Sequence, residues 1–169
     1  ALTFTNKAAK EMKERIQQLI GDEARRLWMG TFHSVFSKIL RFEAEKIGFT
    51  SNYSIYDTDD SKNAIKQLLR ENNYDPKEIR PRTLQRLISD AKNELIHPDQ
   101  YQEKFVHSTL DDITAKIYKQ YVKRLRHNNA MDFDDLLIKP IELFQQHRDV
   151  LEKYQDRFKH ILIDEYQDT

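Results

Sequence analysis

Cysteine is absent from the 169 residues, and glycine and proline are scarce, with three and four residues. Without cysteine the chain can form neither disulfides nor thiolate metal sites. Its six histidines lack close paired spacing, which argues against a zinc site. No apolar run reaches the roughly 18–20 residues of a membrane span and no signal peptide opens the chain, so we expect a cytoplasmic protein without a membrane partner. The shortage of glycine and proline, with 33% charged residues, favours helices.

The three glycines also exclude a phosphate-binding loop from this sequence. Such a loop follows the pattern G-x-x-x-x-G-K-[ST], whereas none of Gly21, Gly30 and Gly48 is followed by lysine. Any nucleotide phosphate would therefore need a second binding element outside this sequence.

The net charge is zero, but the charges are unevenly distributed. Residues 61–128 carry 14 basic and 9 acidic side chains, and residues 129–169 carry 5 basic and 10 acidic ones. We therefore expect the middle of the chain to face a polyanion and its last part to hold a divalent cation.

The apolar run Ile161–Ile163 is followed directly by Asp164 and Glu165. The run predicts a strand buried on both faces, as in a parallel sheet, and ligands bind beyond the carboxyl ends of such strands. Acidic side chains there can hold Mg²⁺ and order a water molecule against a nucleotide phosphate. A solvated acidic turn explains the same residues about as well. Because the chain begins inside a predicted strand, we expect a fragment of a larger nucleotidase whose phosphate loop lies upstream.

Four strings resemble motifs of the UvrD/PcrA/Rep family of superfamily 1 DNA helicases, and they occur in the family's order. Residues Asp164–Thr169 resemble the Walker B element (motif II), Thr3–Ala9 resemble motif Ia, Gly30–Ser34 resemble motif Ib, and Met131–Leu137 resemble a further family signature. The resemblance implies an ATP-dependent DNA helicase that moves 3′→5′ on single-stranded DNA and unwinds duplex DNA. It implies ATP and Mg²⁺ in the intact protein. The fragment is expected to be inactive and to hold no cofactor. The sequence identifies no protein partner.

The resemblance also implies roles for individual residues. Asp164, assisted by Glu165, would bind Mg²⁺; Glu165 would activate the attacking water; and Gln167 would sense the γ-phosphate. On the DNA side, Phe4 would stack on a base. The residues implied to contact phosphate or to lie along the DNA track are Thr5, Asn6, Lys7, Thr31 and His33.

The residues alone leave simpler interpretations open. Phe4 can belong to the core, Lys7 can be a solvated lysine of a first helical turn, and His33 can be a capping or packed histidine. We interpret Trp28, in the apolar run before Gly30, as a core residue. Asp132 is a good helix N-cap, so we interpret the Asp132–Asp135 carboxylates as structural, although they could also bind a metal.

The predicted fold is mainly α: a truncated RecA-like α/β domain with short parallel strands and an inserted all-helical subdomain. Residues 1–56 and 129–169 form the RecA-like part, and residues 57–128 form the insertion, which corresponds to the family's accessory subdomain 1B. Helices are predicted from Thr5 or Asn6 to about Ile20, from 32 to about 47, from Asp57 or Thr58 to about Glu71, from 82 to about 95 and from 109 to about 127.

In the helix of residues 109–127, one face carries Leu110, Ile113, Ile117, Tyr121 and Leu125, and lysines lie opposite. Pro140 is predicted to kink or interrupt the helix that follows Asp132. Candidate DNA contacts in the insertion are Arg80, Arg82, Arg86, Lys119 and Lys123, although a solvated basic face is the commoner explanation of such charges.

Two other functions fit parts of the sequence. The chain could be a stand-alone helical nucleic-acid-binding or scaffold module. It could also be a small metal-dependent phosphohydrolase that uses Asp164, Glu165 and the Asp132–Asp135 carboxylates.

Overall fold

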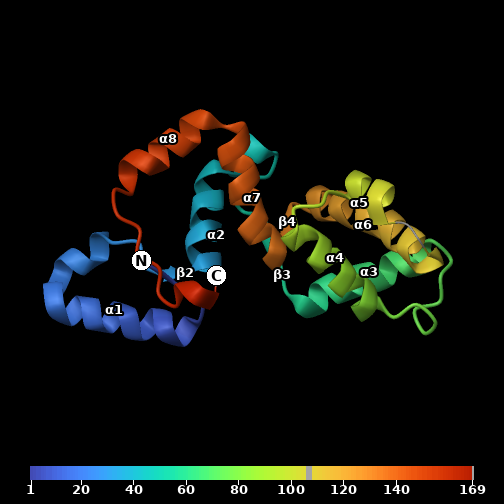
Figure 1. Ribbon diagram of the computed structural model, residues 1–169, viewed down its shortest axis with the longest axis horizontal. Coiled ribbons are helices and arrows are strands. Elements are labelled where there is room, and N and C mark those ends of the chain that lie inside the picture. Colours follow the sequence, from blue (N-terminus) through green and yellow to red (C-terminus); the bar gives the residue numbers. More distant parts are fainter. Residues whose placement is uncertain (106–107, 169) are drawn as a thin grey trace. The chain divides into compact units, whose positions relative to one another are not determined.

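The computed structural model describes residues 1–105 and 108–168, and the chain divides into two compact units (Figure 1). Unit 1 comprises Ala1–Ile47 and Lys139–Thr169, and unit 2 comprises Gly48–Ile138. The described residues are mostly helical with short parallel strands, as the sequence predicted. Unit 2 extends beyond the predicted insertion, residues 57–128, at both ends.

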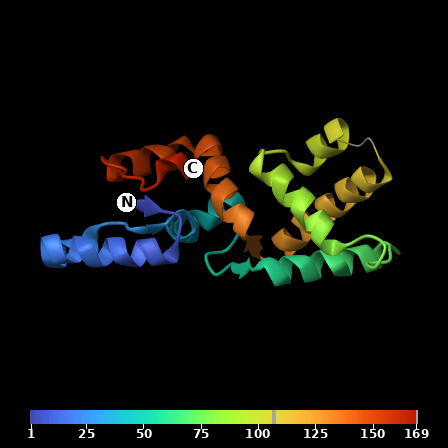
Figure 2. The same cartoon turned by 60° about the horizontal axis from the view of Figure 1, so that its bottom comes forward.

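Unit 1 is organised around parallel strand segments. Strand β1 (Leu2–Thr3) pairs with β2 (Gly30–Thr31) in parallel, and an isolated parallel bridge joins Leu2 to Ile163 on the other side of β1. In both Figure 1 and Figure 2, α1 lies on one side of β1 and α8 on the other. The other elements of unit 1 are α1 (Asn6–Ile20), η1 (Gly21–Arg26), α2 (Phe32–Glu43), η2 (Ala44–Ile47), α8 (Arg148–Arg157) and η3 (Tyr166–Asp168).

The ends of α1 and α2 follow from local capping. Thr5 accepts a hydrogen bond from the Ala8 N–H at 3.1 Å, which satisfies one of the free donors of the first turn of α1. Gly21 ends α1 with φ 62°, a conformation that costs glycine little. The predicted bounds of α1 are confirmed. Helix α2 ends at Glu43, earlier than predicted, because its last turn tightens into the 3₁₀ segment η2.

The prediction of a strand buried on both faces at Ile161–Ile163 is wrong. Only Ile163 forms a bridge, and Ile161 and Leu162 are 64% and 71% exposed. Within the described part of the chain, β1 is the only strand beside this segment. A strand buried in the middle of a sheet needs neighbouring strands on both sides, and among the described residues a strand lies on one side only.

The apolar run Leu27–Met29 lies directly before β2. The strand that pairs with β1 is Gly30–Thr31, not the apolar residues before it, since the register places Gly30 beside Leu2. Trp28 packs edge-on against Phe158, with ring centroids 5.1 Å apart, and is half-buried. Trp28 was interpreted as a core residue; its ring is packed as expected, but it lies at the edge of the core and not inside it.

Unit 2 contains a bundle of four helices and a two-stranded parallel pair. Strands β3 (Ser54–Tyr56) and β4 (Ala130–Asp132) pair in register, so the segments that enter and leave the bundle run side by side. The helices of the bundle are α3 (Thr58–Glu71), α4 (Pro81–Asn93), α5 (Pro98–Phe105) and α6 (Thr109–His127). The sequence predicted three of these helices; β3, β4 and α5 were missed.

The helices of unit 2 share one apolar core. The predicted face of α6 is largely confirmed, but Leu110 is 39% exposed because it lies in the first turn, beyond the core. The predicted lysine face of α6 is exposed. Asp57 caps α3 and forms a reciprocal capping box with Asp60. The fully buried core side chains of these helices include Ile65, Leu69, Leu84, Ile88, Ile117 and Tyr121.

Helix α7 (Phe133–Gln146) is continuous through Pro140, so the prediction of an interruption there is wrong. Proline lacks the N–H that would bond to the carbonyl four residues earlier, and flanking hydrogen bonds carry the helix across this gap.

Candidate functional site

Three of the sequence motifs meet at one edge of the unit 1 strands. Backbone hydrogen bonds fix the arrangement: the Leu2 N–H donates to the Leu162 carbonyl at 2.8 Å, and the Asp164 N–H donates to the Leu2 carbonyl at 2.9 Å. Since the strands are parallel, their carboxyl ends lie together. The residues that follow these ends are Phe4, Phe32 and Asp164. We call this edge the crest.

The acidic pair, Asp164 and Glu165, lies on the protein surface at the crest. Asp164 and Glu165 are both exposed, and the Gln167 amide donates a hydrogen bond to the Glu165 carboxylate. Glu165 has φ 54°, a left-handed conformation that is uncommon for residues other than glycine and often occurs at functional sites. Two exposed carboxylates at a strand tip offer the hard oxygen ligands that Mg²⁺ prefers. The structure therefore brings together all three predicted catalytic residues.

The motif Ia residues follow β1 directly. The Phe4 side chain is 40% exposed, and its ring packs on Phe32 at a centroid distance of 5.2 Å. Thr5 caps α1, and Asn6 and Lys7 are exposed in its first turn. An aromatic ring that is supported on one side and partly exposed can stack on a nucleobase, and a helix N-terminus can bind phosphate.

The motif Ib residues are less accessible. Thr31 is 7% exposed, and its hydroxyl oxygen accepts a hydrogen bond from the Ser34 N–H at 3.2 Å. Its side chain therefore caps α2 and leaves little surface for a ligand. His33 is half-buried and interacts within the chain. Of the two residues, His33 has the more accessible side chain.

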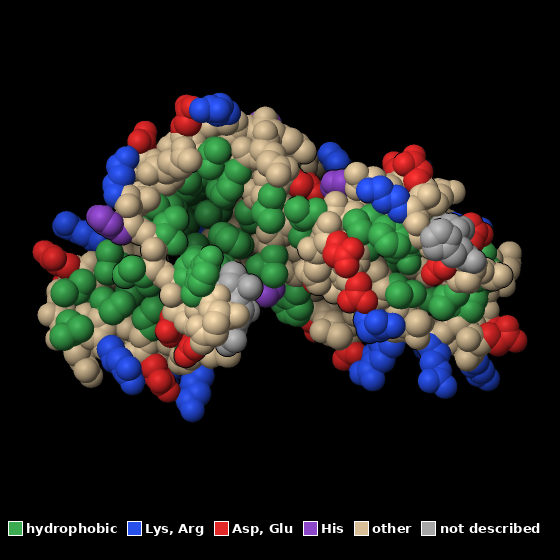
Figure 3. Space-filling view, viewed as in Figure 1, with side chains coloured by type: hydrophobic (Ala, Val, Ile, Leu, Met, Phe, Trp, Pro, Cys, Tyr) green, Lys and Arg blue, Asp and Glu red, His purple; other side chains and the backbone are tan. Residues whose placement is uncertain are grey.

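A basic groove of about 540 Å³ lies between α3 and the start of α4, and two of the three arginines predicted to bind DNA belong to it. Arg80 and Arg82 line the groove, whereas Arg86 lies outside it and pairs with Asp90 at 3.3 Å. Figure 3 shows Lys and Arg side chains along the edge of unit 2 where α3 lies in Figure 1. The lining cations that the sequence reasoning missed are Lys62, Lys66, Arg70 and Lys77.

A helical-wheel reading of α3 would have found three of these missed cations. Lys62, Lys66 and Arg70 are spaced four residues apart and so share one face of the helix, about 6 Å from one to the next. The two predicted lysines of α6 do not line the groove: Lys119 pairs with Asp99 at 2.7 Å, and Lys123 is exposed.

A buried ionic network in unit 2 was not predicted. The Lys92 ammonium is 2.7 Å from Asp132 Oδ2 and 2.9 Å from Asp135 Oδ1, and the Tyr121 hydroxyl donates to Asp132 Oδ2 at 3.0 Å. Burial alone would lower the pKa of Lys92, but the two carboxylates outweigh burial and raise it above its usual value. Burial likewise favours the neutral acid at Asp132, but the Lys92 charge holds its pKa below the usual range.

The network also shows what the acidic cluster does. The Asp135 N–H donates to Asp132 Oδ1 at 2.9 Å, so Asp132 caps α7 as predicted. Burial, followed by the Asp132 charge, raises the pKa of Asp134. Lys92 occupies the place where a metal would need these oxygens, and among the described residues no group of three or more acidic or histidine side chains is arranged to hold a metal. A metal-dependent phosphohydrolase could therefore not use the Asp132–Asp135 carboxylates as its metal ligands.

The described helices include none that is long and apolar enough to cross a membrane. This finding agrees with the absence of a long apolar run from the sequence.

Residues 1–169 match the family described as the UvrD/REP helicase N-terminal domain. The chain therefore belongs to this helicase family, as its four motifs predicted.

Among its relatives is the ATP-dependent DNA helicase PcrA of Bacillus subtilis, 46% identical over 169 residues. PcrA of Staphylococcus aureus strain Mu50 is 47% identical over 171 residues, and PcrA of Staphylococcus epidermidis is 46% identical over 169 residues. Each alignment covers all of this chain but only 23% of the relative, so the chain spans about a quarter of the relatives' length.

Proposed function

We propose that the full-length protein is an ATP-dependent DNA helicase that moves 3′→5′ on single-stranded DNA and unwinds duplex DNA. The observation that carries this proposal is the crest, where the motif II carboxylates follow a segment hydrogen-bonded to the strand that carries motif Ia. A nucleotide site and a DNA site on neighbouring strand ends can respond to each other over a short distance. We expect such a protein in the cytoplasm.

The crest residues have distinct proposed roles. Asp164 and Glu165 would hold Mg²⁺, and the bound ion would neutralise negative charge on the phosphates of ATP. Glu165 orients the attacking water and accepts its proton. The Gln167 amide donates a hydrogen bond to Glu165 in this structure. Its proposed role is to sense whether the γ-phosphate is present and to couple that change to the DNA-binding residues that follow β1. On the DNA side, Phe4 stacks on a base, Thr5, Asn6 and Lys7 approach phosphates, and Thr31 positions His33 beside the strand.

Unit 2 is proposed to be the accessory subdomain inserted in the first RecA-like domain. Its basic groove has six cations and one carboxylate, Asp75, in its lining, so it suits a nucleic-acid backbone. Arg80 and Arg82 are therefore better candidates for duplex contact than Arg86, Lys119 or Lys123.

The double variant Arg80→Glu, Arg82→Glu is expected to flatten the salt dependence of duplex binding. The measurement is the affinity of the full-length protein for duplex DNA at several salt concentrations. An unchanged slope of affinity against salt concentration would show that the groove does not contact the duplex.

The chain of residues 1–169 by itself is expected to show no DNA-stimulated ATP hydrolysis. Its sequence contains no phosphate-binding loop, so the triphosphate has only the crest carboxylates and no cradle of backbone amides. Phosphate release by the purified chain, with and without single-stranded DNA, is the measurement. Turnover that Glu165→Gln abolishes would contradict this expectation.

Replacing Phe4 with alanine in the full-length protein is expected to weaken single-stranded DNA binding by about 1–3 kcal/mol, the usual value of one base–aromatic stacking contact. ATP hydrolysis without DNA should be unchanged, because the Phe4 ring packs on Phe32 and has no proposed role at the nucleotide. DNA affinity is measured by fluorescence anisotropy, and Phe42→Ala provides a control at another exposed phenylalanine of unit 1. Equal losses in the two variants would show that Phe4 acts only through packing.

A further inference from the structure

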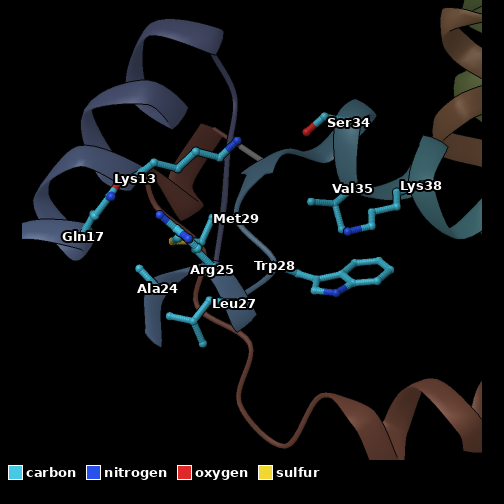
Figure 4. A pocket seen from close by; sticks show the side chains of 10 residues that line it. All are labelled: Lys13, Gln17, Ala24, Arg25, Leu27, Trp28, Met29, Ser34, Val35 and Lys38. Carbon is cyan, nitrogen blue, oxygen red and sulfur yellow. The ribbon is translucent and has the colours of Figure 1, made fainter. Parts of the chain in front are cut away.

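A hollow in unit 1, separate from the crest residues, has a chemical character that the helicase function does not use. It measures about 440 Å³ and lies between α1, η1, the segment before β2 and α2 (Figure 4). None of its ten lining residues is acidic and three are basic. In Figure 4, Lys13 and Arg25 extend into it from α1 and η1, and Lys38 comes from α2. We call this hollow the α1–α2 groove.

The cations of the α1–α2 groove are available to a ligand. Within the described part of the chain Lys13 forms no ion pair, and Arg25 pairs only with Asp22, at 3.3 Å, in a highly exposed contact that contributes little stability. Lys38 lies 4.2 Å from the centre of the Trp28 ring. A carboxylate that reaches the groove can therefore recruit Lys13 and Arg25 without breaking a buried interaction.

Nucleic acid is a poor fit for this groove. A strand binds through phosphate contacts and base stacking, but the Trp28 ring already carries Lys38 and Arg157, whose guanidinium is 4.8 Å from its centre. A base that stacked on Trp28 would have to compete with these two cations. About half of the lining side chains are apolar, and a sugar–phosphate backbone gains nothing from them. They are Ala24, Leu27, Trp28, Met29 and Val35.

Apolar surface continues beside the groove. Leu27 in the lining is 50% exposed, and Ile20, which directly precedes η1 and lies on the same face of α1 as Lys13, is 44% exposed. Exposed large apolar side chains next to a basic rim are typical of a protein–protein contact. The complementary partner carries apolar anchors between acidic residues, as amphipathic helices that bind in grooves do.

We propose that the α1–α2 groove binds an acidic, amphipathic peptide segment of a partner protein. The partner's carboxylates pair with Lys13 and Arg25, and its apolar side chains cover Leu27 and Val35. Lys13 lies in the middle of α1 and Arg25 in η1, so the contact leaves Phe4, Asp164 and Glu165 uncovered. The proposal is independent of the helicase function.

The test uses the full-length protein and a panel of fluorescein-labelled acidic peptides in which a leucine and a phenylalanine are spaced one to four residues apart. Anisotropy is expected to detect saturable binding of at least one peptide. The double variant Lys13→Glu, Arg25→Glu is expected to weaken it at least about tenfold, since each charge pair across an interface is reversed. Arg15→Glu is the matched control, because residue 15 lies on the opposite face of α1, about 200° from residue 13.

Further measurements decide the proposal. Replacing the two apolar residues of the binding peptide with serine is expected to weaken binding about tenfold, as burial of two large side chains is lost. Failure of the whole panel to bind overturns the proposal. Equal binding by the serine peptide, or displacement by an equimolar thymidine oligonucleotide, overturns it in favour of a general polyanion surface. DNA-stimulated ATP hydrolysis by the double variant is expected to be unchanged, which separates this test from that of the helicase.

Discussion

Replacing Glu165 with glutamine in the full-length protein is expected to leave ATP binding intact and to lower DNA-stimulated hydrolysis about 10²–10⁴-fold, the usual contribution of a general base. Glutamine keeps the size of the side chain but cannot accept a proton from water. Glu165 is exposed at the tip of the strand segment, in a left-handed conformation, and is held by Gln167. A left-handed conformation at a residue other than glycine is typical of functional sites, which supports the proposed role.

Hydrolysis is measured as phosphate release with and without single-stranded DNA, and binding with a fluorescent ATP analogue. The matched control is Glu152→Gln, the same change at an exposed glutamate of α8 that pairs with Arg148 at 3.0 Å. The control should hydrolyse ATP at the wild-type rate. A Glu165→Gln variant that keeps a substantial share of the wild-type rate would exclude Glu165 as the base. Loss of ATP binding would instead indicate a role in holding the nucleotide.

Replacing Lys92 with methionine is expected to destabilise unit 2 by about 3–5 kcal/mol, the usual cost of leaving buried charges without their partner. Lys92 is 5% exposed, and its ammonium lies within hydrogen-bonding distance of both Asp132 and Asp135. Methionine fills a similar volume, so the loss reports the charge and not a cavity. Adding Asp132→Asn and Asp135→Asn should recover part of the lost stability, since no charge then remains buried.

The measurement is amide hydrogen exchange of the α4 and α6 peptides, because it reports unit 2 separately from unit 1. Lys123→Met, at an exposed position of the same unit, should change stability by no more than about 0.5 kcal/mol. An equal effect of the two substitutions would show that the network contributes no more than a surface lysine.

The same network predicts how the stability of unit 2 depends on pH. The pKa of Asp132 is lowered in the folded state, so its contribution is present above the unfolded value of about 3.9 and is lost as the pH falls through the folded pKa. The pKa of Lys92 is raised, so its contribution is present below about 10.4 and is lost only as the pH rises through the folded pKa. The network therefore stabilises unit 2 across the neutral range.

Local signals in the sequence predicted local structure well. The sequence predicted that one helix begins at Thr5 or Asn6 and another at Asp57 or Thr58. Thr5 and Asp57 cap these helices, and the side chain of each accepts the expected backbone hydrogen bonds. The α6 face of Ile113, Ile117 and Tyr121 is buried, since its spacing follows the helix period. Helix α5 was missed because a proline such as Pro98 commonly ends helices, although proline also begins helices and Asp99 suits a first turn.

Pairings between distant residues could not be predicted from such signals. Strands β3 and β4 are short and lie more than 70 residues apart in sequence, so no periodicity marks their contact. Lys92 sits in an amphipathic helix, where a lysine normally faces solvent, and its partners come about 40 residues later. The crest was predicted because motif resemblance supplied the long-range information that composition and spacing lack.

The most direct test of the proposed motor is unwinding of short duplexes by the full-length protein with ATP and Mg²⁺. Two substrates are compared, one with a 3′ single-stranded tail and one with a 5′ tail. The family resemblance predicts that only the 3′-tailed duplex is unwound, and the proposed role of Glu165 at the crest predicts that Glu165→Gln stops the reaction. Failure to unwind either duplex, or unwinding that persists in Glu165→Gln, would contradict the proposed motor.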